Sequence, residues 1–280
     1  MRIGNLGGRL VVLADRGAVD VATASGGRFG PDPQAVYSRW AEFTAWAASL
    51  DGAGGQPFDP AQLGAPAPRP PQSFGIGLNY SDHVREAGFT VPDRLSVFSK
   101  FPSCLAGPVS EVVLPPGGHT DWEVELVAVI GAEACQVDAA DAWGHVAGLT
   151  VGQDISERIT QLGGDAPQFS LGKSFPGFGP TGPWLVTPDE FADPDDLELG
   201  CSVNGTEMQK ARTRDMIVPV PQLIARLSAI VTLLPGDIIF TGTPAGVGMG
   251  RSPQVWLQPG DEVISYVEGI GELRQRCVAT

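Results

Sequence analysis

Short β-rich runs separated by turn signals fill most of the chain beyond about residue 70. Two of these runs follow a Pro-Gly-Asp turn: IIFTG comes after residues 235–237, and EVISYVEG comes after residues 259–261. Helical patterns in this part are limited to residues 139–148 and 218–234. Because short strands bury apolar surface by joining into sheets, the pattern predicts a mainly β domain.

Proline and glycine crowd residues 52–72, and this composition is typical of a loop or linker. We therefore predict two parts: a small N-terminal α/β unit with its linker, residues 1–69, and a larger domain, residues 70–280. Within the first part, the hydrophobic pattern predicts two short strands and then a helix. These are residues 10–15, 17–24 and 32–50.

Charge and hydropathy exclude some classes of partner. Acidic residues outnumber basic ones by 32 to 18, which gives a formal net charge of -14 and disfavours binding to phosphate backbones or anionic lipid. No apolar run is long enough to span a membrane, and the apolar run near the N-terminus is too short for a signal peptide. We expect a cytoplasmic protein that binds neither nucleic acid nor membranes.

Two glutamates interrupt a run that otherwise has the pattern of a buried strand, residues 122–130. Side chains two apart on a strand share a face, so Glu123 and Glu125 point the same way, with Cα atoms roughly 6.5 to 7 Å apart. One interpretation is the solvated face of an edge strand. The other is a site for a divalent cation, because hard cations prefer carboxylate oxygens and would offset the repulsion.

Three further places in the chain carry groups with chemical potential. Asp154 follows an apolar run and a glycine, where an isolated aspartate is more often a helix cap or turn residue than a ligand. Lys173 lies in an apolar, glycine-rich context and is either a surface residue or a cation in need of a counter-ion. His83 and Glu86 are one helical turn apart, which suits either an exposed pair or a carboxylate that orients a general base.

Seven motifs in a fixed order point to a family: GLNYSDHVREAG, FSKFPSCLAGP, DWEVELVAVIG, GQDISERITQ, LGKSFPGFGPTGPWLVT, VNGTEMQ and LLPGDIIFTGTPAGVG. Their succession resembles the fumarylacetoacetate hydrolase family over residues 70–280. The resemblance implies a mixed β-sandwich roll, so we expect an α+β, predominantly β fold with the small N-terminal α/β unit attached. It also implies a homodimer, which members of the family commonly form.

The resemblance implies one divalent cation per chain. The family's metal-binding positions match Glu123, Glu125 and Asp154, which would hold Mg²⁺ or Mn²⁺, or Ca²⁺ in a crystal. Three carboxylates leave coordination positions for water and substrate, and an all-oxygen set suits these ions better than zinc. The matching lysine, Lys173, would add a second positive group near the substrate oxygens.

The remaining family positions surround this metal. His83 and Glu86 match a dyad that relatives carry on a mobile lid and use to activate water. Arg158 and Gln161 match residues that point towards substrate or support the metal. Thr243 lies where relatives bind a substrate carboxylate, although a tight turn would explain this segment equally well.

By resemblance, the substrate is a small dicarbonyl acid. We expect a hydrolase that cleaves a carbon–carbon bond in an acylpyruvate or 2,4-diketo acid, because a bound cation stabilises the resulting carbanion as an enolate. The alternative is a decarboxylase, lyase, tautomerase or isomerase acting on a related 2-oxo acid such as oxaloacetate. A nonenzymatic scaffold with a structural cation is a third hypothesis.

Several positions depart from the family pattern. Leu78 replaces an arginine that contacts a substrate carboxylate in vertebrate-type acylpyruvase and oxaloacetate decarboxylase relatives, which makes oxaloacetate the less favoured substrate. Gln153 replaces an asparagine and Ile159 an aspartate, so the contacts around the metal ligands are expected to differ. Tyr80 and Lys100 also lie in family motifs, and neither is assigned a chemical step.

Overall fold

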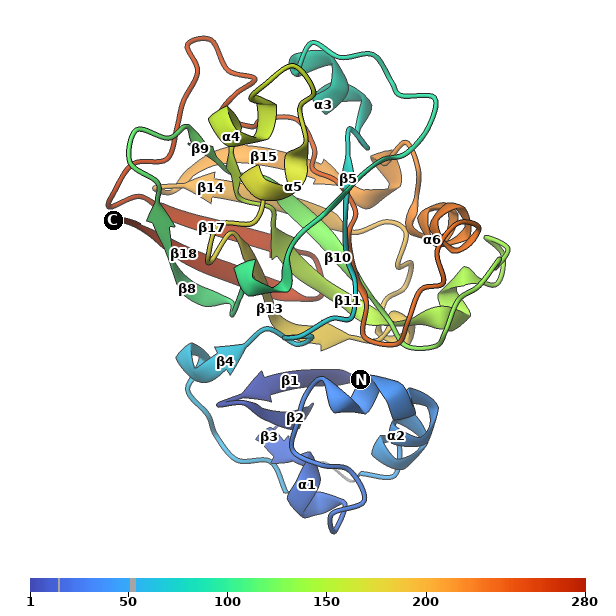
Figure 1. The fold of residues 1–280 in the computed structure, drawn as a ribbon. Helices are drawn as coiled ribbons and strands as arrows, with labels where there is room; N and C mark the ends of the chain where they lie inside the picture. Colours follow the sequence, from blue (N-terminus) through green and yellow to red (C-terminus); the bar gives the residue numbers. More distant parts are fainter. Residues whose placement is uncertain (15, 51–53) are drawn as a thin grey trace.

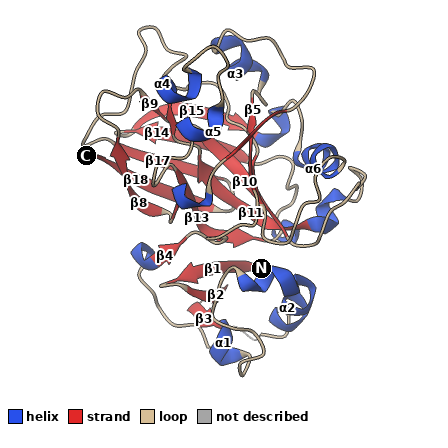
Figure 2. Cartoon of the chain, in the orientation of Figure 1, coloured by secondary structure: helices blue, strands red, loops and turns tan. Residues whose placement is uncertain are grey.

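The computed structural model describes residues 1–14, 16–50 and 54–280, and its strands form two large sheets (Figures 1 and 2). Within these residues the larger sheet has eleven strands. Its main path runs β3 (Gly17–Asp20), β2 (Arg9–Ala14), β1 (Arg2–Leu6), β13 (Gly179–Val186), β11 (Val146–Gln153), β10 (Val124–Ile130), β16 (Ile238–Phe240), β5 (Ser73–Gly77), β6 (Ser96–Ser99). β4 (Leu63–Gly64) pairs with β1, and β7 (Leu105–Ala106) pairs with β13.

The second sheet has five strands among the described residues and packs on the first. Its order is β15 (Thr206–Arg212), β14 (Glu198–Val203), β17 (Glu262–Val267), β18 (Gly271–Ala279), β8 (Val109–Leu114). Buried aliphatic side chains from both sheets interdigitate in one core. A separate short ladder joins β9 (Thr120–Asp121) to β12 (Ser156–Glu157). The fold is therefore α+β and predominantly β, as the sequence predicts.

Short helices lie around the sheets: α1 (Val21–Ala24), α2 (Trp40–Ala47), α3 (Ser81–Glu86), α4 (Arg158–Leu162), α5 (Phe169–Gly172) and α6 (Val220–Ser228). Figure 1 shows α3, α4 and α5 together at the end of the molecule opposite the N-terminal unit. α6 lies within the predicted helical region 218–234. None of the helices in the described part of the chain is long and apolar enough to cross a bilayer.

The N-terminal unit continues the larger sheet, because β1 pairs with β13. A second core, formed with the outer face of this sheet, contains Phe43 from α2 and Val127 from β10. The strand predicted for residues 17–24 is too long. It ends at Asp20, whose carboxylate accepts a hydrogen bond from the Thr23 backbone N–H at 2.9 Å and so caps α1.

The helix predicted for residues 139–148 is wrong. Only a single 3-10 turn forms, over Ala142–His145, and β11 begins at Val146. β11 is buried on both faces between β10 and β13, so its apolar residues are continuous and carry no period-two signal. A buried strand of this kind cannot be distinguished from a short buried helix by periodicity.

The two faces of β10 have different environments, and this places the glutamates. Its even-numbered residues, from Val124 to Ile130, face the core between the sheets. The odd-numbered side chains lie on the opposite face, where Val127 and Val129 contact the N-terminal unit and Glu125 lies nearer the other end. β10 pairs with β11 on one side and β16 on the other, so the edge-strand interpretation is wrong.

Candidate active site

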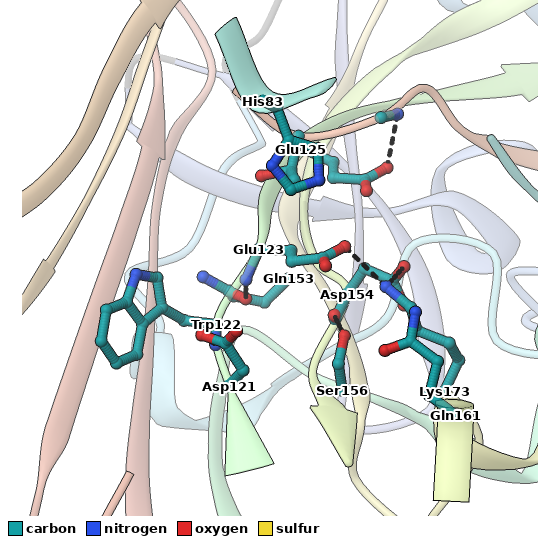
Figure 3. Close-up of polar contacts among 12 residues, drawn as sticks. His83, Asp121, Trp122, Glu123, Glu125, Gln153, Asp154, Ser156, Gln161 and Lys173 are labelled. Carbon is teal, nitrogen blue, oxygen red and sulfur yellow. Dashed lines mark hydrogen bonds and ion pairs between the residues drawn. The ribbon is translucent and has the colours of Figure 1, made fainter. Parts of the chain in front are cut away.

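Three carboxylates meet where β10 and β11 lie side by side. Glu123 immediately precedes β10, Glu125 lies on it, and Asp154 directly follows β11 (Figure 3). The antiparallel register places Gly152 opposite Glu125, and the Asp154 backbone N–H donates to the Glu123 carbonyl at 2.8 Å. One oxygen from each carboxylate lies within 4.8 Å of the others, and all three residues are buried.

Buried cations neutralise two of the three carboxylates. The Lys173 ammonium lies 2.6 Å from Glu123 Oε2 and 2.6 Å from Asp154 Oδ2, as Figure 3 shows. Lys100 Nζ lies 2.6 Å from Asp154 Oδ1, and Arg158 Nη1 lies 2.7 Å from Glu123 Oε1. These ion pairs are almost fully shielded from water, so each charge depends on its partners.

Glu125 lacks a cationic partner among the described residues. Its carboxylate accepts one backbone hydrogen bond, from Gly242 at 2.7 Å. Burial and the neighbouring Asp154 and Glu123 raise the pKa of Glu125 well above its usual value. Burial also opposes ionisation of Glu123, but the charges of Lys173 and Arg158 outweigh it and lower the Glu123 pKa to about 2.

This charge pattern fits a divalent cation. Glu125 has no side-chain counter-ion in the described structure, and two other carboxylates, those of Glu123 and Asp154, lie close to it. A cation held by Glu123, Glu125 and Asp154 would remove the penalty that raises the Glu125 pKa. The donor set contains only oxygen, which suits Mg²⁺ or Mn²⁺.

His83 and Glu86 form a hydrogen-bonded pair on α3. His83 Nδ1 lies 2.9 Å from Glu86 Oε1, and the His83 side chain is buried. Since Glu86 engages Nδ1, Nε2 is the nitrogen left to exchange a proton with a bound molecule. The exposed-pair interpretation of His83 and Glu86 is therefore wrong for His83, which lines the same pocket as Glu123 and Lys173.

The predicted substrate contacts line this pocket, but protein groups already engage them. Arg158 donates from Nε and Nη2 to Asp121 Oδ2, at 2.9 and 2.6 Å, and from Nη1 to Gln161 at 2.8 Å. The Thr243 hydroxyl donates to the Val124 carbonyl at 2.9 Å. These contacts fix all three side chains at the pocket wall before any ligand enters.

The rest of the pocket wall is apolar. It includes Leu78, Phe89, Phe98 and Met249. Leu78 has a φ angle of 60°, in the left-handed region that a bulky residue rarely adopts, and it turns the chain from β5 towards α3. The free volume inside this pocket is about 30 Å³.

Two residues that support the site were not predicted to do so. Lys100 is fully buried and, besides Asp154, donates to the carbonyls of Lys173 and Phe178. Asp121 accepts hydrogen bonds from Arg158 and from the backbone N–H groups of two residues in the loop after β16. Only the position of each in a family motif distinguishes it in the sequence, because their partners are remote in the chain.

Gln153 shows how the contacts around the metal ligands are made in this chain. Its side-chain oxygen accepts from the Glu123 backbone N–H at 2.7 Å, and its amide donates to Ser265 at 3.0 Å. Ile159, the second departure from the family pattern, is exposed. It therefore takes no part in the buried ion-pair network.

Most of the chain matches one protein family. A protein-family model described as fumarylacetoacetate (FAA) hydrolase C-terminal matches residues 72–278. The chain is 46% identical over 215 residues to the mitochondrial oxaloacetate tautomerase FAHD2A of Bos taurus, which covers 76% of this chain and 68% of the bovine protein. The chain therefore belongs to the fumarylacetoacetate hydrolase family, as its motifs indicate.

Solved structures agree with this assignment. A protein of Mycobacterium smegmatis, provisionally named HpcE, is 52% identical with a TM-score of 0.94, and the match covers 100% of both chains. Maleylpyruvate hydrolase of Sphingobium sp. SYK-6, in complex with manganese(II) and pyruvate, is 31% identical with a TM-score of 0.80, covering 100% of this chain and 99% of that one. Family members are thus enzymes with different reactions, and one structure contains manganese.

Proposed function

We propose that this chain is a divalent-metal-dependent enzyme that moves protons on an enolisable 2-oxo acid. The observation that carries the proposal is the position of the buried His83, which is hydrogen-bonded to Glu86 and lines the same pocket as Glu123 and Lys173. A base beside a site for a divalent cation is suited to removing a proton from a bound water or from a carbon next to a carbonyl group. A purely structural cation would not require such a base.

The protein groups have separate parts in this chemistry. Glu123, Glu125 and Asp154 would hold Mg²⁺ or Mn²⁺, which when bound lowers the energy of negative charge on the substrate oxygens. Lys173 supplies a fixed positive charge at the same place, and Arg158 and Gln161 shape the adjoining wall. Glu86 holds the His83 ring through Nδ1, which leaves Nε2 to accept and return the proton.

Hydrolysis of an acylpyruvate is the reaction that the pocket favours. His83 would take a proton from water as the oxygen attacks the acyl carbonyl. The bond to the central carbon then breaks, its electron pair forms the enolate of pyruvate, and the proton returned to that carbon completes pyruvate and a carboxylic acid. The apolar wall around Leu78 and Phe98 suits an uncharged acyl group better than a second carboxylate.

Keto–enol tautomerisation is the second candidate, and the name of the bovine relative favours it. The same base would move one proton between the central carbon and the enol oxygen, with no change in mass. Oxaloacetate is then the first substrate to test, although its second carboxylate would face the apolar wall. The bovine relative thus weighs against the expectation from Leu78 that oxaloacetate is disfavoured.

One assay separates these reactions. The enol absorbance of acylpyruvates, 2,4-diketo acids and oxaloacetate is followed with purified protein in Mg²⁺ or Mn²⁺, and again with chelator. Metal-dependent loss of absorbance with two smaller products by mass spectrometry identifies a hydrolase, and loss without a change in mass identifies a tautomerase. Unchanged absorbance across the panel, or full activity of His83→Ala in both reactions, would refute the proposal.

The setting of the enzyme is also proposed by analogy with the family. We propose a homodimer acting on a small dicarbonyl acid in the cytoplasm. Analytical ultracentrifugation tests the assembly, and a monomer at micromolar concentration would contradict it. Fractionation of cells tests the compartment. The bovine relative is named as mitochondrial, so a cytoplasmic location remains a prediction.

A further inference from the structure

The carboxylate of Glu86 has a second set of contacts besides His83. The backbone N–H of Gly246, in the loop between β16 and β17, donates to Glu86 Oε1 at 3.0 Å and to Oε2 at 2.9 Å. The same Oε1 lies 2.9 Å from His83 Nδ1. One carboxylate therefore joins α3 to this loop and orients the imidazole, so the two functions share one position of the Glu86 side chain.

Gly250 leaves the space that this carboxylate occupies. A Cβ atom at Gly250 would lie 2.8 Å from Glu86 Cδ and Oε2 and 2.9 Å from Cγ, closer than real Cβ contacts. The backbone at Gly250 is outside the left-handed region, so an alanine there meets no backbone strain. The contact with Glu86 is the obstacle, and the end of a flexible side chain can relieve it by moving.

The loop itself is held by contacts that do not involve Glu86. Asp121 accepts from the backbone N–H groups of Gly248 at 2.6 Å and Met249 at 3.0 Å. Trp122 Nε1 donates to the Gly246 carbonyl at 3.1 Å. Asp121 is fully buried and also paired with Arg158, so it holds the loop in place. An added Cβ at Gly250 would therefore displace the Glu86 side chain rather than the loop.

We propose that Gly246 and Gly250 form a seat for the Glu86 carboxylate, and that Gly250 is a positioning residue for His83. This inference rests on the proposed function, because it assigns the orientation of the same base. The seat sets the direction of Nε2 by fixing the carboxylate that holds Nδ1. It also makes the assembled pair depend on α3 being docked against the loop.

Gly250→Ala tests the seat in the metal-loaded protein. The ordinary limit for a Cβ contact is 3.4 Å, so the carboxylate must retreat by about 0.6 Å. A misplacement of this size near a reacting group costs about tenfold or more in rate. We expect kcat to fall by that factor and its pH profile to shift, because the imidazole is reoriented. KM and metal affinity should stay within about twofold of the wild type, and the melting temperature within about 2 °C.

Gly144→Ala is the matched control, because a Cβ there meets no atom within 4 Å and its backbone is also outside the left-handed region. Glu86→Asp in combination with Gly250→Ala is the second test. The shorter side chain withdraws the carboxylate from the added methyl group, so the double variant should be more active than the product of the two single effects predicts. Independent, multiplicative effects would overturn the proposal.

The outcomes separate this proposal from the proposed function. If His83→Ala and Glu86→Gln keep full activity, the proposed function fails and the seat has no base to position. If both lose activity while Gly250→Ala keeps wild-type kcat, the seat alone is refuted. A Gly250→Ala protein that loses melting temperature or metal binding in step with kcat would likewise refute a positioning role.

Discussion

Replacing Lys173 with methionine tests whether the ammonium stands in for positive charge that a metal would supply. The group bonds Glu123 and Asp154 at 2.6 Å each and is 2% exposed. Breaking a buried ion pair costs about 3–5 kcal/mol. Since Arg158 still pairs with Glu123 and Lys100 with Asp154, we expect the lower end of that range, about 3 kcal/mol, in the metal-free protein.

The expected shift in melting temperature follows from the length of the chain. At about 2.1 cal/mol/K per residue, 280 residues have an unfolding entropy of about 0.6 kcal/mol/K, so about 3 kcal/mol lowers the melting temperature by roughly 5 °C. Scanning calorimetry in chelator measures this shift. Lys210→Met, at a half-exposed lysine 3.4 Å from Glu198, is the control and should change it by less than about 2 °C.

Saturating Mn²⁺ should then stabilise Lys173→Met more than the wild type, because the cation replaces the lost positive charge. Wild-type stability of the variant in chelator would refute the assigned ion pairs. Equal stabilisation of both proteins by Mn²⁺ would refute the idea that lysine and metal neutralise the same carboxylates.

Three further substitutions test the metal, the fold and the pocket. Glu125→Gln keeps an oxygen for the Gly242 N–H but removes the charge of a metal ligand. Calorimetric titration should therefore show an affinity for Mn²⁺ that is lower by ~100-fold or more, while the melting temperature in chelator does not fall. An unchanged affinity would exclude Glu125 as a ligand. Phe43→Ala should cost about 3–5 kcal/mol in urea unfolding, still in one transition because β1 pairs with β13, whereas two separate transitions would show independent domains. Leu78→Arg should shift the ratio of kcat/KM values from apolar acylpyruvates towards oxaloacetate, and an unchanged ratio would exclude Leu78 from substrate selection.

Local sequence patterns predicted an element correctly where one hydrophobic period or one turn signal dominated the segment. The turn at residues 259–261 leads into β17, and the amphipathic pattern in 218–234 contains α6. They failed where burial removed the period, as in β11, and where a cap redirected the chain, as at Asp20. Both failures have a physical cause, because a strand buried on both faces and a four-residue helix carry little periodic information.

The order of motifs determined the family and the identity of the carboxylate cluster, because Glu123, Glu125 and Asp154 stand at motif positions that are local in the chain. Strand geometry also required that the two glutamates share a face. These inferences need only the spacing of residues, which a sequence contains.

Tertiary structure alone decided which charges meet. Glu123 is separated by 50 residues from Lys173, and Glu86 by 160 residues from Gly246, so neither direct contact follows from the local spacing of residues. Asp121 binds Arg158 and the loop after β16, and Glu86 binds His83 and the same loop. These contacts depend on how β9, α3 and α4 pack around that loop. Side-chain electrostatics act through space, and only the folded chain sets those distances.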